Sequence, residues 1–181
     1  IGIMNIMLQS RRRKTKETCI DVVLETEGTG RTDVDTGIEL LDMILTNLGR
    51  AALFDLKIKA VGDLKTGDHH TIEDTGITLG KTIAQAIKSG IGSSTVPSRR
   101  ALAMAALRFG EPGYRGEFSF KSESSGGMTL ENFGHFLRAL AYNGGFTLVI
   151  RAEDGDDMSK IEAMSTALGR AIRKALKDSG K

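Results

Sequence analysis

The chain has 181 residues, of which 40% are hydrophobic and 27% charged, and its formal net charge at pH 7 is +2. These values are typical of a folded globular protein with one sizeable core or two small fused ones, and they exclude a disordered chain. The charge is too close to zero to indicate nucleic-acid binding by bulk electrostatics. Cys19, the one cysteine, has no internal partner and lies in a strand-like run, which predicts a buried thiol and a reducing, cytoplasmic setting.

The N-terminal segment shows no pattern that we interpret as a targeting signal. An apolar run over 1–8 precedes the basic run Arg11–Lys16, the reverse of the order in a secretory signal, and it is too short to span a membrane. No aromatic residues are interleaved with the basic run, so it offers no stacking platform for bases. We expect no nucleic-acid and no membrane partner, and we interpret the basic run as an edge strand guarded by charge.

Apolar spacing in the first half of the chain predicts strands followed by helices. Thr36 and Glu39 have the spacing of a capping box, which indicates the start of a helix. A short strand after the turn at 28–30 would complete a hairpin with the strand before it. The predicted elements are strand-like runs over 4–27, 32–34 and 53–61, a helix from Ile38 to Gly49, and a longer helix from Asp68 to Gly90.

The same order of elements returns in the second half. Gly92–Thr95, with Pro97 beyond it, is rich in glycine and serine and is predicted to be a connector between the halves. Thr129 is predicted to cap a helix that includes Phe133 and Leu140. The remaining predicted elements are strands over 100–107, 114–121 and 146–152 and a final helix over 159–177.

The two halves also align with each other residue by residue. The long helices match at an offset of 89, which pairs Glu73 with Glu162 and Gly80 with Gly169, while the short helices and the strands after them match at an offset of 92. Because glycine lowers helix propensity, the paired glycines indicate close approach of helices. We predict an α+β fold with internal duplication of a ββαβα-like unit, divided into 1–92 and 93–181, because each unit alone is too small to bury its core well.

The segment Asp68–Asp74 holds two of the three histidines and opens the first long helix. On a helix, His69, His70 and Glu73 project from one face, which is the arrangement of a metal half-site. A solvated first helical turn, with carboxylates near the positive end of the helix dipole, explains the same spacing. Spacing alone leaves both interpretations open.

Seven short motifs spread over nearly the whole chain form a recognisable set. They are Arg13–Thr18, Thr36–Ile38, Gly62-Asp63, Asp68–Asp74, Pro97 with Ala101–Ala103, Ile161–Ala163 and Ala167-Leu168. With this set the chain resembles the imidazoleglycerol-phosphate dehydratase family of histidine biosynthesis. The resemblance implies helices sandwiched between two four-stranded sheets, a ribosomal protein S5 domain 2-like fold, and trimers that build large shells.

The resemblance also implies a manganese-dependent reaction. In the family, two His-His-x-x-Glu motifs and a further histidine hold manganese at subunit contacts, carboxylates move protons, and Arg or Lys groups hold the phosphate. Loss of water from the substrate requires a stabilised imidazolate and a carboxylate that removes a proton from carbon. The positions that match imply His69, His70 and Glu73 as metal ligands and Glu17 and Glu162 as catalytic residues.

Other positions depart from the family pattern, and the departures fall on ligands, acids and phosphate cations rather than on the core. A thioether replaces a histidine at Met43, and it would be a poor manganese ligand. The remaining departures are Ala51 at a histidine, Met158 and Ser159 at the second His-His pair, Arg99 and Arg100 at two acids, Glu111 to Gly113 without the family arginine, Ser165-Thr166 in place of Phe-Lys, and no arginine after Gly90-Ile91.

These changes lead to two functional hypotheses. We predict a family member that is inactive or crippled, keeps the fold, and forms a trimer-based homo-oligomer, alone or beside an intact homologue; manganese would be its metal, if it binds one. The alternative is an active dehydratase whose missing groups come from a different alignment of the motifs or from a neighbouring subunit. Since fold alone does not establish function, the sequence leaves both hypotheses to experiment.

Three further features have competing interpretations. His135 is the repeat-mate of Met43 and could face a site, but its position beside Phe133 and Phe136 favours a packed structural histidine. The acidic loop over 154–157 could bind calcium weakly, but its spacing fits acids at a helix N-terminus better. The Arg99-Arg100 pair could bind an anion, but its place at a strand start favours a solvated pair.

Overall fold

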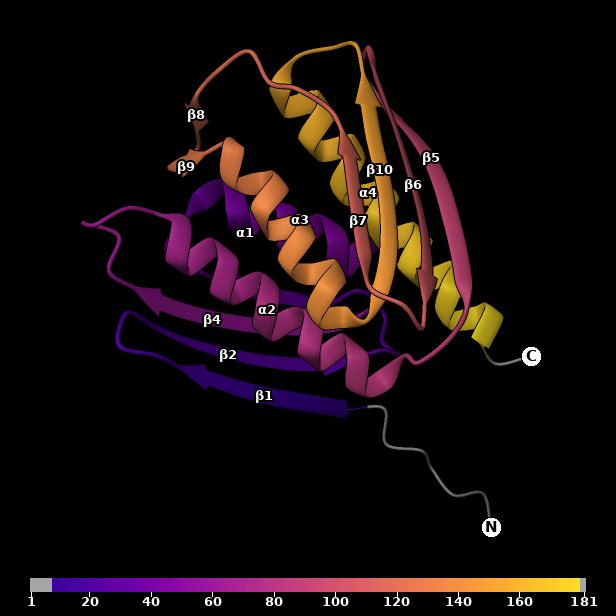
Figure 1. Ribbon diagram of the computed structural model, residues 1–181, viewed down its shortest axis with the longest axis horizontal. Helices are drawn as coiled ribbons and strands as arrows, with labels where there is room; N and C mark the ends of the chain where they lie inside the picture. The colour runs from indigo at the N-terminus through magenta and orange to yellow at the C-terminus, as the bar shows by residue number, and fades with distance from the viewer. Residues whose placement is uncertain (1–7, 180–181) are drawn as a thin grey trace.

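Two four-stranded sheets enclose four helices in a sheet–helix–helix–sheet arrangement over residues 8–179, which are the residues that the computed structural model describes (Figure 1). The first sheet has the order β1 (Leu8–Lys14), β2 (Thr18–Glu25), β4 (Asp55–Gly62), β3 (Thr32–Asp35). The second has the order β5 (Ile91–Ser98), β6 (Ala101–Phe109), β10 (Phe146–Glu153), β7 (Gly113–Glu117). The helices are α1 (Glu39–Ala51), α2 (His69–Ala86), α3 (Glu131–Gly144) and α4 (Asp157–Ser179), and β8 (Ser124–Ser125) pairs with β9 (Met128–Thr129).

The two sheets have the same topology, which confirms the predicted α+β duplication. In each sheet the first three strands in spatial order are antiparallel, and the fourth lies parallel to its neighbour. The predicted hairpin of 32–34 with the preceding strand is therefore wrong, because β3 pairs with β4 instead. A parallel pair needs a crossover, and α1 supplies it. The division at residues 92 and 93 stays a prediction.

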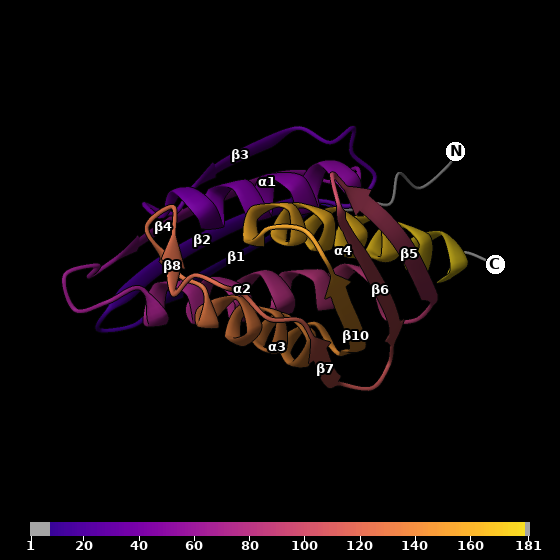
Figure 2. The same cartoon turned by 90° about the horizontal axis from the view of Figure 1, so that it is seen from above.

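The helices of the two halves are interleaved. α2 packs against α3, and α1 packs against α4, so each long helix contacts the short helix of the other half (Figure 2). The paired glycines lie at these contacts. A Cβ atom on Gly80 would lie 2.7 Å from the carbonyl oxygen of Leu140, and one on Gly169 would lie 2.5 Å from that of Leu48. The predicted close approach of helices is therefore confirmed, and only glycine fits at either position.

The predicted connector at 92–95 is wrong, because these residues form half of β5. Gly92, Ser94 and Val96 alternate toward α4, and a Cβ atom on Gly92 would lie 2.0 Å from the carbonyl oxygen of Ala171. Small residues in this strand therefore allow a helix to pack closely, which is a common reason for glycine inside a strand. Pro97 is tolerated because β5 is an edge strand.

Both predicted helix caps are also wrong. α1 begins after Ile38, and the Thr36 backbone N–H and hydroxyl both donate to Asp42 Oδ1, at 2.8 and 2.6 Å, instead of forming a capping box. α3 begins after Leu130, and the Thr129 N–H donates to the Asp68 carboxylate, which belongs to a different helix. In both cases a carboxylate outside the predicted cap, Asp42 or Asp68, accepts the backbone N–H of the threonine.

Cys19 is half-buried rather than buried, which corrects the predicted packed thiol. It lies on the outward face of β2, where the Arg12 guanidinium approaches its Sγ atom at 3.5 Å. The strand-like part of 4–27 that precedes Leu8 lies outside the described residues. Among the helices described, none has the length and apolar character needed to cross a membrane.

Candidate functional site

The chain brings all three of its histidines together at the N-terminal end of α2. We call this group the α2 site. It takes side chains from α2, from α3 and from the turn between β1 and β2. Its members are Glu17, Asp68, His69, His70, Glu73, Asn132 and His135.

A hydrogen-bond network ties the start of α2 to α3 and fixes the orientation of one histidine. Asn132 Nδ2 donates to Asp68 Oδ1 at 3.0 Å, since a carboxylate can only accept, and this places Asn132 Oδ1 3.0 Å from His69 Nδ1. His69 Nδ1 must then donate to the amide oxygen. In the neutral ring, Nε2 therefore carries the lone pair, as it does in histidines that bind metals.

Two imidazole–carboxylate pairs form within the site. His69 Nε2 lies 3.0 Å from Glu73 Oε2, and His70 Nδ1 lies 2.8 Å from Glu17 Oε2. All four side chains are about half exposed, so a ligand from solvent can reach them. A lone pair on His69 and a carboxylate at this distance repel each other unless a proton or a metal ion lies between them.

His135 belongs to this group, which corrects its interpretation as a packed core histidine. It is exposed, and its ring lies edge-on to that of His69 with centroids 5.3 Å apart. Its neighbours Phe133 and Phe136 are fully buried, so the helix turns His135 away from the core. The repeat offset of 92 was a usable signal, because it pairs His135 with Met43, the position at which the family pattern quoted above has a histidine.

The donor chemistry suits a divalent metal, but the coordination is incomplete. Over residues 8–179, no group of three or more His, Cys, Asp or Glu side chains is arranged to hold one ion. His69 Nε2 and Glu73 are the pair best placed to bind one, and imidazole with carboxylate suits manganese. A metal there would take its remaining ligands from water or from another chain.

Glu162, the other predicted catalytic residue, lies in a separate pocket of about 440 Å³ at the N-terminal end of α4. We call this the α4 pocket. Arg99 and Lys121 line it together with three acids, and no histidine takes part, whereas the α2 site holds three histidines. The remaining lining residues are Ser122, Ser125, Gly155, Asp156, Asp157, Met158 and Ser159.

The residues at the predicted second His-His position cannot replace the lost imidazoles. Met158 is exposed, and Ser159 is 3% exposed with its N–H donated to Asp156 Oδ1 at 2.7 Å. The bonds from the backbone and hydroxyl of Ser159 hold the pKa of Asp156 below its usual value. The acidic loop over 154–157 therefore caps a helix through Asp156, which is the interpretation that the sequence favoured. Met43, where the family pattern has another histidine, packs against the core.

One segment connects the two sites. At one end, Asp157 accepts the backbone N–H groups of Lys121 and Ser122, each at 2.8 Å. At the other end, Asp68 accepts the Thr129 N–H at 2.6 Å. The carboxylates at the starts of both long helices thus hold the two ends of the segment 121–129.

Comparisons with known proteins agree with this architecture. The family model described as imidazoleglycerol-phosphate dehydratase matches residues 36–172. Proteins of that name from Methanosarcina barkeri and Mycolicibacterium gilvum are 40% and 41% identical, covering 93% and 91% of this chain and 92% and 88% of theirs. The crystal structure of imidazoleglycerol-phosphate dehydratase from Staphylococcus aureus has a TM-score of 0.82 at 24% identity, over 93% of this chain and 97% of that one.

The family model matches residues 36–172, which is most of the chain, and the two relatives are 40% and 41% identical to it. The structural comparison independently supports the fold of two sheets around four helices. This chain belongs to the imidazoleglycerol-phosphate dehydratase family.

Proposed function

We propose that this chain is an imidazoleglycerol-phosphate dehydratase homologue of histidine biosynthesis that has lost most or all of the dehydration activity. The observation that carries the proposal is the difference between the two long helices. α2 begins with His69 and His70, whereas α4 has Met158 and a buried Ser159 at the 89-residue offset. The α2 half of a two-part site keeps the histidines that can bind a metal, and the α4 half does not.

The retained residues support only part of a reaction. Glu17 paired with His70 can accept and donate a proton, and His69 with Glu73 can bind a cation. A manganese ion, when bound, would stabilise an imidazolate-like substrate ring. Loss of most of the other ligands and acids removes the transition-state stabilisation on which turnover depends, since each such group commonly contributes several kcal/mol.

A second candidate function, the active dehydratase, is favoured by a specific observation. The relatives named imidazoleglycerol-phosphate dehydratase are about two-fifths identical to this chain over nearly its full length. In that case a neighbouring subunit supplies the ligands that α4 lacks, and the protein is a trimer-based homo-oligomer. The inactive form can keep the same oligomer, either alone or with an intact homologue.

Metal content and turnover measured on the same sample distinguish the two candidates. After incubation with excess manganese and removal of free metal, we expect less than one manganese per chain by mass spectrometry and no dehydration of imidazoleglycerol phosphate above the buffer rate. Stoichiometric manganese with turnover that disappears in His69→Ala would establish the active dehydratase instead. Light scattering on that sample gives the oligomer size.

Placing histidines at the substituted positions tests whether their absence limits manganese binding. The triple variant Met43→His, Met158→His, Ser159→His should bind more manganese than the wild type, and adding His69→Ala should remove the gain. The matched control is Met43→Leu, Met158→Leu, Ser159→Ala, which changes the same positions without adding ligands. Equal metal content in the restored and control variants would show that the substitutions at these positions are not what limits binding.

A further inference from the structure

The basic run of β1 forms one wall of a pocket that the proposed function does not use. The pocket has a volume of about 260 Å³ and lies between β1 and α2, and all but one of its lining residues are cationic. We call it the β1–α2 pocket. It is lined by Arg11, Arg12, Arg13, Lys14, Thr78 and Lys81.

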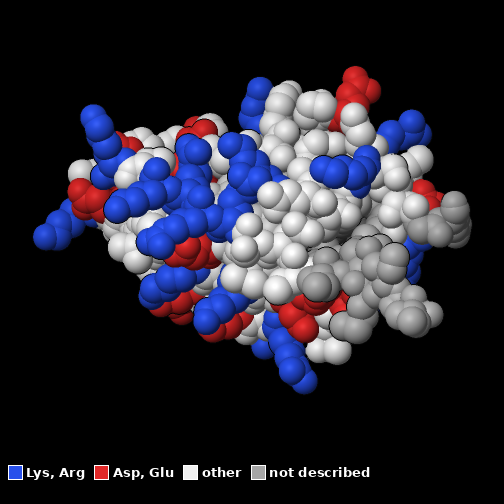
Figure 3. Space-filling model, turned by 90° about the horizontal axis from the view of Figure 1, so that it is seen from below, with Lys and Arg blue, Asp and Glu red and all other residues white. Residues whose placement is uncertain are grey.

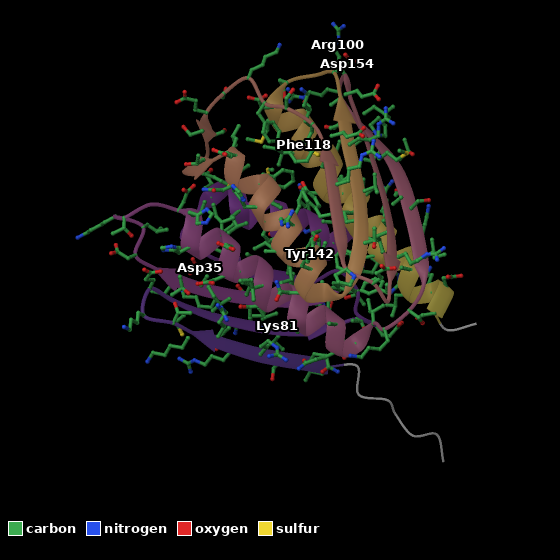
Figure 4. All side chains as sticks on the ribbon, viewed as in Figure 1. Asp35, Lys81, Arg100, Phe118, Tyr142 and Asp154 are labelled. Atoms are coloured by element: carbon green, nitrogen blue, oxygen red, sulfur yellow. The ribbon has the colours of Figure 1, made fainter. Side chains whose placement is uncertain are left out.

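Helical spacing and strand alternation together build this pocket. Asp74, Thr78 and Lys81 are four and then three residues apart, so they share the face of α2 that lies against β1. On β1, Arg11 and Arg13 are partly buried on the inner side, while their neighbours point outward. Figure 4 shows Lys81 on the part of α2 that crosses β1, and Figure 3, seen from below, shows Lys and Arg side chains gathered with some Asp and Glu over the outer face of the first sheet.

The cations of the pocket greatly outnumber the acids that neutralise them. Arg13 Nε lies 3.3 Å from Asp74 Oδ1, and Asp74 also accepts the hydroxyl of Thr18. Arg12 pairs with Asp21 at 3.6 Å in an exposed and therefore weak contact. Among residues 8–179, no carboxylate lies within salt-bridge distance of the other three cations, which are Arg11, Lys14 and Lys81.

Arg11 carries a second and independent sign of an unfilled site. Its Nε atom is shielded from solvent and has no hydrogen-bond partner among the described residues. A shielded guanidinium nitrogen without a partner is costly, and a nearby anion compensates this cost by its charge. Thr78 already donates its hydroxyl hydrogen to the Asp74 carbonyl at 2.7 Å, so the cations are the groups left to bind a ligand.

We propose that the β1–α2 pocket binds a small phosphate-bearing anion, such as inorganic phosphate or diphosphate. Arg and Lys together provide forked and point-charge contacts that suit phosphate oxygens. β1 is an edge strand, so backbone N–H groups on its open side add further donors. The pocket is smaller than most sites for drug-sized ligands, which favours a compact anion. The proposal is independent of the dehydratase site.

Calorimetric titration of the full chain with phosphate and with diphosphate, at constant ionic strength, tests the proposal. We expect saturable binding that Lys81→Gln and Arg11→Gln each weaken at least about tenfold, the loss expected for one charged contact. Lys174→Gln is the matched control, because it removes the same charge from an exposed position on α4. Arg13 is left unchanged, since its pair with Asp74 has a structural role.

Four results would overturn the assignment. The first is no saturable binding of either anion by the wild type, and the second is equal affinity in Lys81→Gln, Arg11→Gln and Lys174→Gln. The third is loss of binding in Arg99→Gln but not in Lys81→Gln, which would place the anion in the α4 pocket. A single-stranded oligonucleotide that binds more tightly than diphosphate, with the same dependence on Lys81, would replace the small anion by nucleic acid. Circular dichroism confirms that each variant is folded.

Discussion

The N-terminal ends of α2 and α4 occupy equivalent places in the two halves, yet they present different chemistry. At α2, imidazoles and carboxylates form close pairs and contact the partner helix through Asn132. At α4, Glu162 shares a pocket with Arg99, Lys121 and two aspartates but no histidine, and Asp156 is used to cap the helix. The backbone arrangement is retained because it depends on core packing, while the side chains at the helix ends are free to change.

The difference also extends to how each helix start is held. Asp156 binds the N–H of its own helix, whereas Asp68 binds residues that precede and begin α3. The start of α4 therefore has a cap within its own first turn, in addition to the contacts of Asp157 with Lys121 and Ser122. The start of α2 depends on the other half of the molecule, so its histidines are positioned by tertiary contacts.

The largest effect on stability should come from the paired glycines, which the two halves share. Gly80→Ala and Gly169→Ala should each destabilise the protein by about 1 to 3 kcal/mol, because the added methyl groups meet backbone atoms of the facing helix. Urea denaturation measures the change. Gly134→Ala is the control, since its Cβ would have no atom closer than 3.8 Å, and it should stabilise α3 by up to about 1 kcal/mol. Similar results at all three positions would show that the helices do not pack this closely.

The next effect should be specific to the α2 end. Asn132→Ala removes the contacts to Asp68 and His69, and we expect a loss of about 1 to 2 kcal/mol in the free energy of unfolding. Any manganese bound at His69 should be held about 10 to 100 times more weakly, because the ring orientation is no longer fixed. Asn143→Ala, on the same helix and remote from the histidines, is the control for both measurements.

The smallest effect should be specific to the α4 end and should depend on pH. The lowered pKa of Asp156 means that its charged form stabilises the folded state above the unfolded pKa of about 3.9 and loses this role as pH falls through the lower folded value. Asp156→Ala should therefore lower the thermal midpoint at pH 7, and the difference from wild type should shrink in acid. Asp33→Ala, an exposed control on β3, should show no such pattern. A difference that grows in acid would contradict the prediction.

The sequence predictions that succeeded depend on core packing, and those that failed depend on local caps or local composition. The offsets of 89 and 92 predicted the duplication and the glycine contacts, because periodicity and repeats follow from core packing. The cap predictions at Thr36 and Thr129 failed, and the backbone N–H groups of these threonines donate to Asp42 and Asp68 instead. The β5 strand was missed because its glycine and serine content serves contact with α4, which no local pattern shows.

The sequence by itself determined the fold class and the family, since these are recorded in residue identity and spacing. Only the tertiary structure decided that His135 joins His69, that Asn132 fixes the ring of His69, and that the basic run of β1 meets Lys81. The physical reason is that these contacts join elements distant in the chain. Their geometry depends on how α2 packs on α3 and β1, and local spacing does not contain that information.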